Sequence, residues 1–436
     1  MEKIILLFEK ITNKIKDLDL SFLIRYDPKN KSKLNFTNIL FASLSNLNCS
    51  GIESVSSFLE EEKIVTVTKT ALINKRNDSK TFEYIRKLNE HLINIFYDPS
   101  NFFINRYNFN IDTKHSCYID YNGNHNGNHN NNNLFINTTK LRFVGCDCCK
   151  LDILKSAVNS DNIKISKSGN YGTMLISSLF DVINNIPINY YSVHSDEKNF
   201  NKKKVNETTG LLEQFDKLNS NDVVIVDKWY YSKYLHKKFI EKNIGYMFRV
   251  KDNSLLFRDM YFGKSKIIKL NDVDVQLFKY KIKGNTYHIL TSITEKISIA
   301  EIKALYWRRW KIETDNKKFK YDILSSNIRS KNNNSIAVDI ECIKFMSIIS
   351  SIIEHIGKEK LKENKKFHTR NCIDILYRSL LKIILYEPEN YDEIYRLIGI
   401  IYKKTIDIII GRTVERKRVS PSTKWNTNGN RYGSSK

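Results

Sequence analysis

Two short runs of apolar and β-branched residues, each followed by an aspartate, constrain the fold of this chain most. They are KLRFVGC, which precedes Asp147, and DVVIV, which precedes Asp227. Runs of this length and composition predict buried strands. Between them, YGTMLISSLFDVINNI has the apolar spacing of a helix, and INYYSVHS predicts a further strand. Strands interleaved with a helix predict a mixed α/β layer, with both aspartates at strand ends.

The chain after Asp227 continues this alternation and then becomes rich in strands. SKYLHKKFIEKN predicts a helix, and four strand-like segments follow it: GYMFRVK, SKIIKL, DVQLFKYKI and TYHILTSI. Lys283-Gly284-Asn285 joins the last two and is typical of a hairpin turn. We therefore expect a β-rich insertion over about residues 245–295.

Helical patterns flank this region on both sides. Residues 1–115 are predicted to form a helical domain that includes IESVSSFLEEE and TVTKTALINKRNDSKTFEYIRKLNEHLINIFY. The second segment carries six Lys and Arg residues across a helix, a turn and a second helix. Such a unit could lay a helix in a DNA groove, or the charges could simply form a solvated face. Residues 331–411 are predicted to form a C-terminal helical region.

Charge points to the class of partner. The chain has 71 Lys and Arg residues against 48 Asp and Glu, a formal net charge of +23. A surplus of this size favours a nucleic-acid partner, although a basic soluble protein or one attracted to anionic membranes would share it. No segment is apolar enough for a signal-peptide core or a membrane span. Seven cysteines without framework spacing indicate a reducing, intracellular setting.

Two segments contain too few apolar residues to form a hydrophobic core. Residues 116–137 include NGNHNGNHNNNN and are expected to form a low-complexity linker. Residues 412–436 hold seven Lys or Arg residues against one Glu and are expected to be a basic, flexible tail.

The cysteines at 146, 148 and 149 lie around the first aspartate. The outer two have the C-x2-C spacing of half a zinc site, but no second pair follows. We interpret them as buried free thiols.

One predicted helical segment carries a carboxylate, two cations and a phenol at helical spacing. On an α-helix, Tyr306, Arg309, Glu313 and Lys320 fall within roughly 60° of one another. A carboxylate flanked by two cations and a phenol suits a metal ligand set among phosphate contacts, although Arg309 and Glu313 could also form an ordinary ion pair four residues apart. An adjacent stripe is the face expected to be buried: Leu305, Ile312, Phe319 and Ile323.

The order Tyr-x2-Arg-x3-Glu-x6-Lys resembles the signature of DDE transposases of the insertion-sequence-four group. RFVGCDCCKLDI looks like the family's first-aspartate segment, and VVIVDKWYYSKYL like its second. The resemblance covers residues 138–330. It implies a ribonuclease H-like catalytic core with a β-rich insertion, inside an α/β fold with helical N-terminal and C-terminal regions.

The resemblance also implies site residues. Asp147, Asp227 and Glu313 would be the catalytic, metal-binding triad, and the family's ions would be Mg²⁺ or Mn²⁺, two per site. Carboxylates suit this role because hard divalent cations prefer oxygen ligands, and a pair of ions assists attack on a phosphodiester.

The family's DNA contacts map onto the same helix. Arg309 and Lys320 would hold phosphates of the element's end, and Tyr306 would contact the backbone near the cut. This sequence departs from the family after each aspartate. Cys148 follows the first where Gly is common, and Lys228 follows the second where Arg is common.

The function predicted from these observations is metal-dependent cleavage at element ends and strand transfer into target DNA. Double-stranded DNA is the expected partner, and a homodimer is expected because one assembly must hold two ends. The expected location is inside the cell. Two alternatives stay open: a transposase-derived protein that binds DNA without cutting it, and a simple ribonuclease H-like nuclease.

Overall fold

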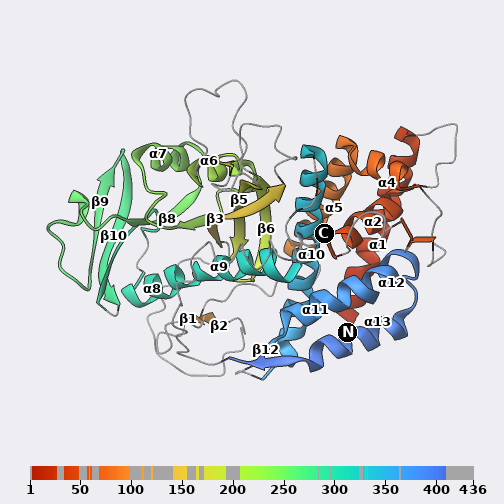
Figure 1. Cartoon of the computed structure of the whole chain (residues 1–436). Coiled ribbons are helices and arrows are strands. Elements are labelled where there is room, and N and C mark those ends of the chain that lie inside the picture. Colours follow the sequence, from red (N-terminus) through yellow and green to blue (C-terminus); the bar gives the residue numbers. More distant parts are fainter. Residues whose placement is uncertain are drawn as a thin grey trace, which may run out of the picture.

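In the computed structural model, a mixed β-sheet forms the centre of the molecule and a group of helices stands at one end of it (Figure 1). The structure describes residues 2–26, 34–48, 56–57, 59–60, 68–98, 110–111, 119–120, 141–154, 164–165, 171–192, 207–282, 284–294, 297–323, 328, 330, 332–362 and 365–408. The predicted Asn-rich linker and basic tail lie almost wholly outside these residues, as does most of the first predicted N-terminal segment.

Five strands make the core of the sheet: β3 (Arg142–Leu154), β5 (Tyr171–Asp181), β6 (Ile186–Ser192), β7 (Asp222–Val226) and β8 (Gly245–Val250). Their order is β6-β5-β3-β7-β8. The first three pair antiparallel, whereas β7 is parallel to β3 and β8 is parallel to β7. This order and these directions are those of a ribonuclease H-like core, which confirms the predicted fold class.

The helix predicted over residues 171–186 is wrong, because this segment forms β5. Met174, Ile176, Leu179 and Phe180 are all buried. These residues lie on both faces of the strand. β5 is an interior strand, and helices pack on both faces of the sheet there, so both faces of β5 are buried. A strand buried on both faces has no strict alternation of apolar and polar residues, so its pattern can mimic that of a helix.

The β-rich insertion extends this sheet. β9 (Lys264–Leu270), β10 (Val273–Ile282) and β11 (Asn285–Thr291) form antiparallel hairpins, and β11 pairs with β8. β8 itself therefore belongs to the core, although the sequence placed it at the start of the insertion. Asn271 and Asp272 both have positive φ at the β9–β10 turn, and Gly284 has φ +80° at the predicted β10–β11 hairpin. These residue types suit the left-handed conformation that tight hairpins require.

Helices cover both faces of the sheet. One face is covered by α6 (Glu207–Leu212) and α7 (Lys233–Glu241), which pack on a core that includes Val144, Val224 and Phe248. The opposite face is covered by α8 (Ile299–Arg308) and α9 (Trp310–Lys317), which pack on residues such as Phe143 and Ile225. Because successive strand residues point to opposite faces, Asp147 shares the α9 face with Phe143 and Gly145.

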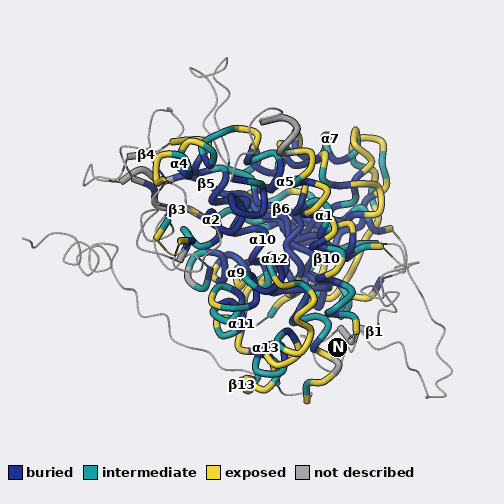
Figure 2. The backbone as a smooth tube through the Cα atoms, turned by 90° about the vertical axis from the view of Figure 1, so that its right-hand side faces the viewer, coloured by how far each residue is buried: buried dark blue, intermediate teal, exposed yellow. Residues whose placement is uncertain are grey.

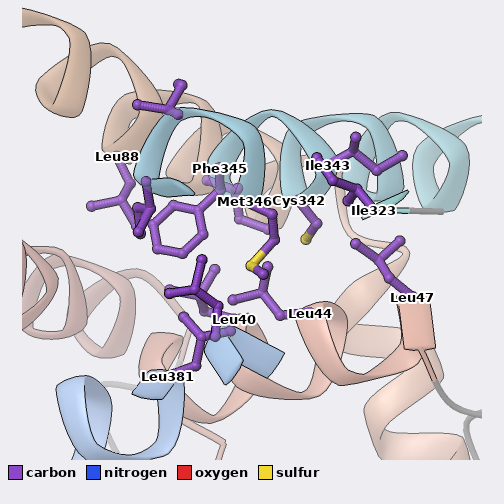
Figure 3. Packing of buried hydrophobic residues seen from close by; sticks show 14 of the residues in the cluster. Leu40, Leu44, Leu47, Leu88, Ile323, Cys342, Ile343, Phe345, Met346 and Leu381 are labelled. Atoms are coloured by element: carbon purple, nitrogen blue, oxygen red, sulfur yellow. The ribbon is translucent and has the colours of Figure 1, made fainter. Parts of the chain in front are cut away.

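The helices from the two ends of the chain share one hydrophobic core (Figure 3). It joins residues of α2 (Phe36–Asn48), α5 (Ser79–Tyr97), α10 (Asn333–Gly357) and α12 (Leu381–Tyr386). α10 runs through the centre of the molecule as a mostly buried helix (Figure 2). The same core includes Ile153 and Ile176 of the sheet, so the helical part is continuous with the sheet.

The remaining elements are short or lie at the periphery. They are α1 (Glu2–Tyr26), α4 (Lys69–Arg76), α11 (Thr369–Ile375) and α13 (Tyr391–Lys403), with the strands β1 (Asn110–Ile111), β2 (Ile119–Asp120), β4 (Lys164–Ile165), β12 (Lys365–Phe367) and β13 (Thr405–Asp407). The helix-turn-helix segment predicted in the N-terminal region is present as α4 and α5, capped by Thr68 and Asp78. Within the described residues, every helix is too short or too polar to span a bilayer.

Candidate active site

Asp147 and Asp227 come level with each other on neighbouring parallel strands. Arg142 to Gly145 of β3 align with Asp222 to Ile225 of β7, so each β3 residue faces the β7 residue 80 positions later. Continuing this register sets Asp147 beside Asp227, on strands whose axes lie about 4.8 Å apart. Asp227 directly follows β7, as predicted. Asp147 does not end its strand, because β3 continues to pair with β5 as far as Leu154.

Because β7 ends at Val226, β3 has no paired strand on that side at Asp147 among the residues that the structure describes. On its other side β3 is still paired, with Ser178 of β5 directly opposite Asp147. Asp227 is oriented by its own turn, since its Oδ1 accepts a hydrogen bond of 2.7 Å from the backbone N–H of Trp229. This side chain-to-backbone bond is a common way for an aspartate to fix a turn.

The helix that carries Glu313 lies directly over this part of the sheet. A Cβ on Gly145 would stand 3.7 Å from Cβ of Ile312, an ordinary contact distance, so α9 packs against this position of β3; the neighbour that would have to move is Val182, whose Cγ1 would lie at 2.9 Å. Ser178 Oγ donates to Asn316 Oδ1 at 2.9 Å and ties the helix to β5 opposite Asp147. Glu313, next to Ile312, is thereby brought to the same region as the two aspartates.

The three acids influence one another electrostatically. The pKa of Asp147 is raised to about 6, mainly by burial. Arg309 and the backbone N–H of Cys148 lower it, and the negative charges of Glu313 and Asp227 raise it. Burial is thus the main reason that the ionised form of Asp147 is disfavoured, and the two other acids add a smaller effect in the same direction.

The predicted single helix around Glu313 is divided into three parts. α8 begins with a capping box between Ser298 and Glu301, and the chain turns tightly at Arg309 before α9. A π-helical turn, η7 (Lys318–Ile323), follows α9. Because a π turn holds more residues than an α turn, Lys320 no longer has the angle to Glu313 that a uniform α-helix predicts. The predicted apolar stripe is confirmed, since Leu305, Ile312, Phe319 and Ile323 are all buried.

Arg309 is enclosed within the site. Its side chain is almost fully buried, and Nη2 lies 3.5 Å from Oε1 of Glu313. Its guanidinium also lies over the rings of Tyr306 and Trp310, at 5.9 and 5.6 Å from the centroids. Burial alone would lower the pKa of Arg309, but the charges of Tyr306 and of all three acids raise it. Arg309 Nε is buried without a hydrogen-bond partner.

The other two predicted DNA contacts occupy different surroundings. Tyr306 is buried, which raises the pKa of its phenol, and it interacts with the charges of Arg309, Arg249 and Asp227. Lys320 is half-buried and acts on Cys149, whose pKa is raised to about 12 chiefly by burial and lowered by this lysine. Tyr306 and Arg309 thus interact electrostatically with the acids. Lys320 interacts with Cys149, which lies two residues beyond Asp147 on the same face of β3.

The three clustered cysteines have no disulfide partner in the described part of the chain. Cys146 and Cys149 are buried and Cys148 is half-buried. The hydroxyl of Tyr230 lies 3.9 Å from Sγ of Cys146 and 3.6 Å from Sγ of Cys148. Burial raises the pKa of all three thiols, which makes them poor nucleophiles.

Two residues near the acids have no signal in the sequence pattern. Glu207, at the start of α6, has a raised pKa because of burial and of the charges of Asp147 and Asp227. Arg249 lies on β8, with its guanidinium 4.3 Å from the centroid of Tyr287 and its Nε buried without a hydrogen-bond partner. Only the folded sheet brings these residues to the site, since neither belongs to a recognisable motif.

A buried network of hydrogen bonds connects α9 to β6 and α10. Tyr190 of β6 donates a hydrogen bond of 2.5 Å to Oδ2 of Asp315, and Ser347 of α10 lies within 3.1 Å of the same hydroxyl. Burial raises the pKa of Asp315 to about 6, against the lowering effects of Lys318 and these hydroxyls. Asp315 follows Glu313 by two residues, so this network fixes the helix that carries the candidate ligand.

The donor set of the site suits a divalent metal ion. Asp147, Asp227 and Glu313 offer only carboxylate oxygens, the ligands that hard cations prefer, and a cation would offset the repulsion that raises the pKa of Asp147. Within the described residues, however, no three His, Cys, Asp or Glu side chains stand close enough together to hold an ion as they are.

A comparison with family models decides the relationship. The model of the transposase DDE domain matches residues 197–349. These residues therefore resemble a transposase DDE domain. The matched part of the DDE domain contains Asp227 and Glu313, whereas Asp147 precedes it. The predicted kinship with DDE transposases is confirmed, and the insertion-sequence-four group within them stays a prediction.

Similarity to the other known proteins is distant. One solved structure similar to this chain is a piggyBac transposase synaptic complex with hairpin DNA, determined by cryo-EM. The TM-score is 0.40 and the identity 13%, over 97% of this chain and 89% of that one. A likeness this remote supports no conclusion about function. No curated protein matches the chain.

Proposed function

We propose that this DDE-domain protein is an intracellular DNA transposase that cleaves phosphodiester bonds at the ends of its element and joins those ends to target DNA. The observation that supports the proposal is the register of β3 and β7, which would set Asp147 beside Asp227 if continued by two residues, on the sheet face that α9 covers. This alignment supports the proposal that three acids far apart in the sequence share one site.

The three carboxylates would hold Mg²⁺ or Mn²⁺, two ions per site in the family. When bound, such ions activate the attacking hydroxyl or water and stabilise the departing oxygen. The raised pKa of Asp147 supports this role, because burial, and to a smaller extent the charges of Glu313 and Asp227, disfavour its ionised form and a bound cation would offset both.

Arg309, Tyr306 and Lys320 would bind the DNA end. Arg309 stays charged at any working pH, and its unpartnered Nε leaves a donor for a phosphate oxygen. Burial raises the pKa of the Tyr306 phenol, so its hydroxyl stays protonated and able to donate. The half-buried Lys320 would add a phosphate contact further along α9 and η7.

The whole assembly would be a homodimer on DNA, because two element ends must be held together for joining. The net charge of +23 supports a strong electrostatic attraction to duplex DNA. We expect the binding constant to fall steeply as salt rises, since bound phosphates release counterions.

The proposal is tested with duplexes that carry the inverted repeats flanking the protein's own gene. Wild-type protein should cut them only when Mg²⁺ or Mn²⁺ is present, and Asp227→Ala should abolish cutting while DNA affinity changes less than about twofold. Asp274→Ala, which removes an exposed carboxylate of β10, is the matched control and should cut normally. Robust cutting by Asp227→Ala would remove that residue from the site. Tight binding by a wild-type protein that never cuts would instead identify a DNA-binding descendant of a transposase.

A further inference from the structure

The outer edge of the insertion concentrates positive charge on one face. Lys264 of β9 stands directly opposite Lys279 of β10 in the antiparallel register, and Lys266 stands opposite Leu277. Lys281 follows Lys279 by two residues and so shares its face. We call these four lysines, Lys264, Lys266, Lys279 and Lys281, the cationic edge.

The opposed pair is unfavourable for the free protein. Side chains directly across an antiparallel pair have Cβ atoms about 5 Å apart, and like charges at this distance destabilise the sheet. The same two strands also contain the favourable arrangement, because Asp274 stands opposite Lys269 on the other face. The hairpin thus carries a complementary pair on one face and a repulsive pair on the other.

No carboxylate within the described residues forms an ion pair with the cationic edge. Lys279 Nζ donates to the backbone carbonyl of Phe257 at 3.1 Å. Its other neighbour is the ring of Phe262, which lies 5.0 Å from Lys279 Nζ and 4.3 Å from Lys281 Nζ. Phe262 is 48% exposed and Tyr261 is 82% exposed. Two lysines therefore converge on an exposed aromatic ring, where Lys281 is exposed and Lys279 is half-buried.

Protection of a sheet edge explains only part of this pattern. Lysines on an edge strand discourage pairing with other chains, and β9 is the edge strand of this sheet. β10 is an interior strand, paired on both sides by β9 and β11. Lys279 and Lys281 lie on β10, so edge protection does not account for them.

We propose that the cationic edge binds the phosphate backbone of duplex DNA, away from the cut. This inference rests on the proposed function, because it assumes that the protein acts on DNA. It adds a second surface that contacts the same DNA. A backbone contact requires no particular base sequence, and phosphates of the bound duplex would neutralise the repulsion between Lys264 and Lys279.

The double variant Lys264→Gln/Lys279→Gln tests the proposal through two measurements that move in opposite directions. The melting temperature of the free protein should rise, because the repulsive pair is removed. Affinity for a duplex of arbitrary sequence should fall, and the slope of log K against log salt should decrease by about 1 to 2, since each lysine on a phosphate contributes about 1.

Lys269→Gln is the matched control, since it removes a lysine from the same strand but from the opposite face. It should leave the salt slope unchanged and should not raise the melting temperature, because Lys269 stands opposite Asp274 and not opposite another lysine. Binding is measured without divalent ions, so a protein that binds DNA but fails to cut it tests the cationic edge independently of the proposed catalysis. An unchanged salt slope in the double variant would overturn the inference, and increased self-association with it would identify edge protection as the role of these lysines.

Discussion

At the scale of single residues, the ionised form of Asp147 is destabilised by its buried position. Its carboxylate is largely buried near Asp227 and Glu313, and its pKa rises from the ordinary 3.8 to about 6. The folded protein therefore binds more protons than the unfolded chain between these two values. Because of this difference, the free energy of unfolding should decrease as pH rises from about 4 to 6, and the loss should be complete above that range.

Asp147→Asn should thus stabilise the metal-free protein at neutral pH by about 1 to 2 kcal/mol, somewhat less than the full pKa shift would give because the group is not wholly buried. Urea denaturation at pH 4.5 and pH 7.5, in the presence of a chelator, measures the effect. Asp315 has a similarly raised pKa in both proteins, so its contribution cancels in the difference. Equal stability of variant and wild type at pH 7.5 would show that the charge of Asp147 is not repelled.

At the scale of elements, the sequence predicted best where one pattern had one structural meaning. DVVIV followed by Asp227, the hairpins of the insertion and the apolar stripe of the Glu313 helix all have the predicted form. β5 was mistaken for a helix because burial on both faces removed its alternation. The tight turn at Arg309 and the π turn η7 were not predictable, because they arise from packing of the helix against the sheet and α10.

The motif predicts Tyr306, Arg309 and Glu313 as site residues because their spacing is recognisable within a short segment of sequence, and this assignment stays a prediction. Glu207 and Arg249 could not be found this way, since only the arrangement of α6 and β8 around the sheet brings Glu207 near Asp147 and Asp227 and brings Arg249 near Tyr306. The position of Asp147 within β3 also depends on how far β5 continues the pairing, which the sequence of β3 alone does not contain.

The hydrogen bond from Tyr190 to Asp315 should position the glutamate helix. Tyr190→Phe leaves a buried carboxylate without its shortest donor, so we expect a loss of about 1 to 3 kcal/mol in the free energy of unfolding. The cleavage rate should decrease at least several-fold at saturating DNA, with little change in affinity, because Glu313 is displaced while the phosphate contacts remain.

Tyr280→Phe is the matched control for this change. The hydroxyl of Tyr280 is buried but has no hydrogen-bond partner, so its removal should cost nothing or slightly stabilise the protein. Urea denaturation and single-turnover cleavage measure both variants. A normal cleavage rate in Tyr190→Phe, despite reduced stability, would mean that the network supports the fold and does not position the helix.

At the scale of the whole molecule, the two helical regions form one body. The sequence separates residues 1–115 from 331–411, and the boundaries of these units stay a prediction. In the structure, however, α5 packs along α10, and Asn89 of α5 donates to Oε2 of Glu341 at 2.7 Å. The long separation in sequence hides this partnership, because nothing in either helical pattern says which apolar face it will meet.

A buried ion pair between α4 and α10 provides the test of this unity. Arg76 pairs with Asp339, both side chains are buried, and Ser330 also bonds to both of them. Arg76→Ala would leave Asp339 buried without its cation, which should cost about 3 to 5 kcal/mol. Arg76→Met/Asp339→Leu removes both charges and should recover most of that loss, since apolar residues of similar size replace them.

Chemical denaturation measures the coupling when it is followed separately by two signals. Tryptophan fluorescence reports on the sheet and on α8 and α9 through Trp229, Trp307 and Trp310, once the fourth tryptophan is removed by Trp425→Phe. Far-ultraviolet circular dichroism is dominated by the helices. If α10 joins the N-terminal helices to the sheet in one cooperative unit, Arg76→Ala should shift both transitions to lower denaturant by the same amount. A shift of the helical signal alone would show that the N-terminal helices unfold as a separate domain. In that case α10 would be held by the sheet, and the interface with α4 and α5 would be a surface that the catalytic part does not need.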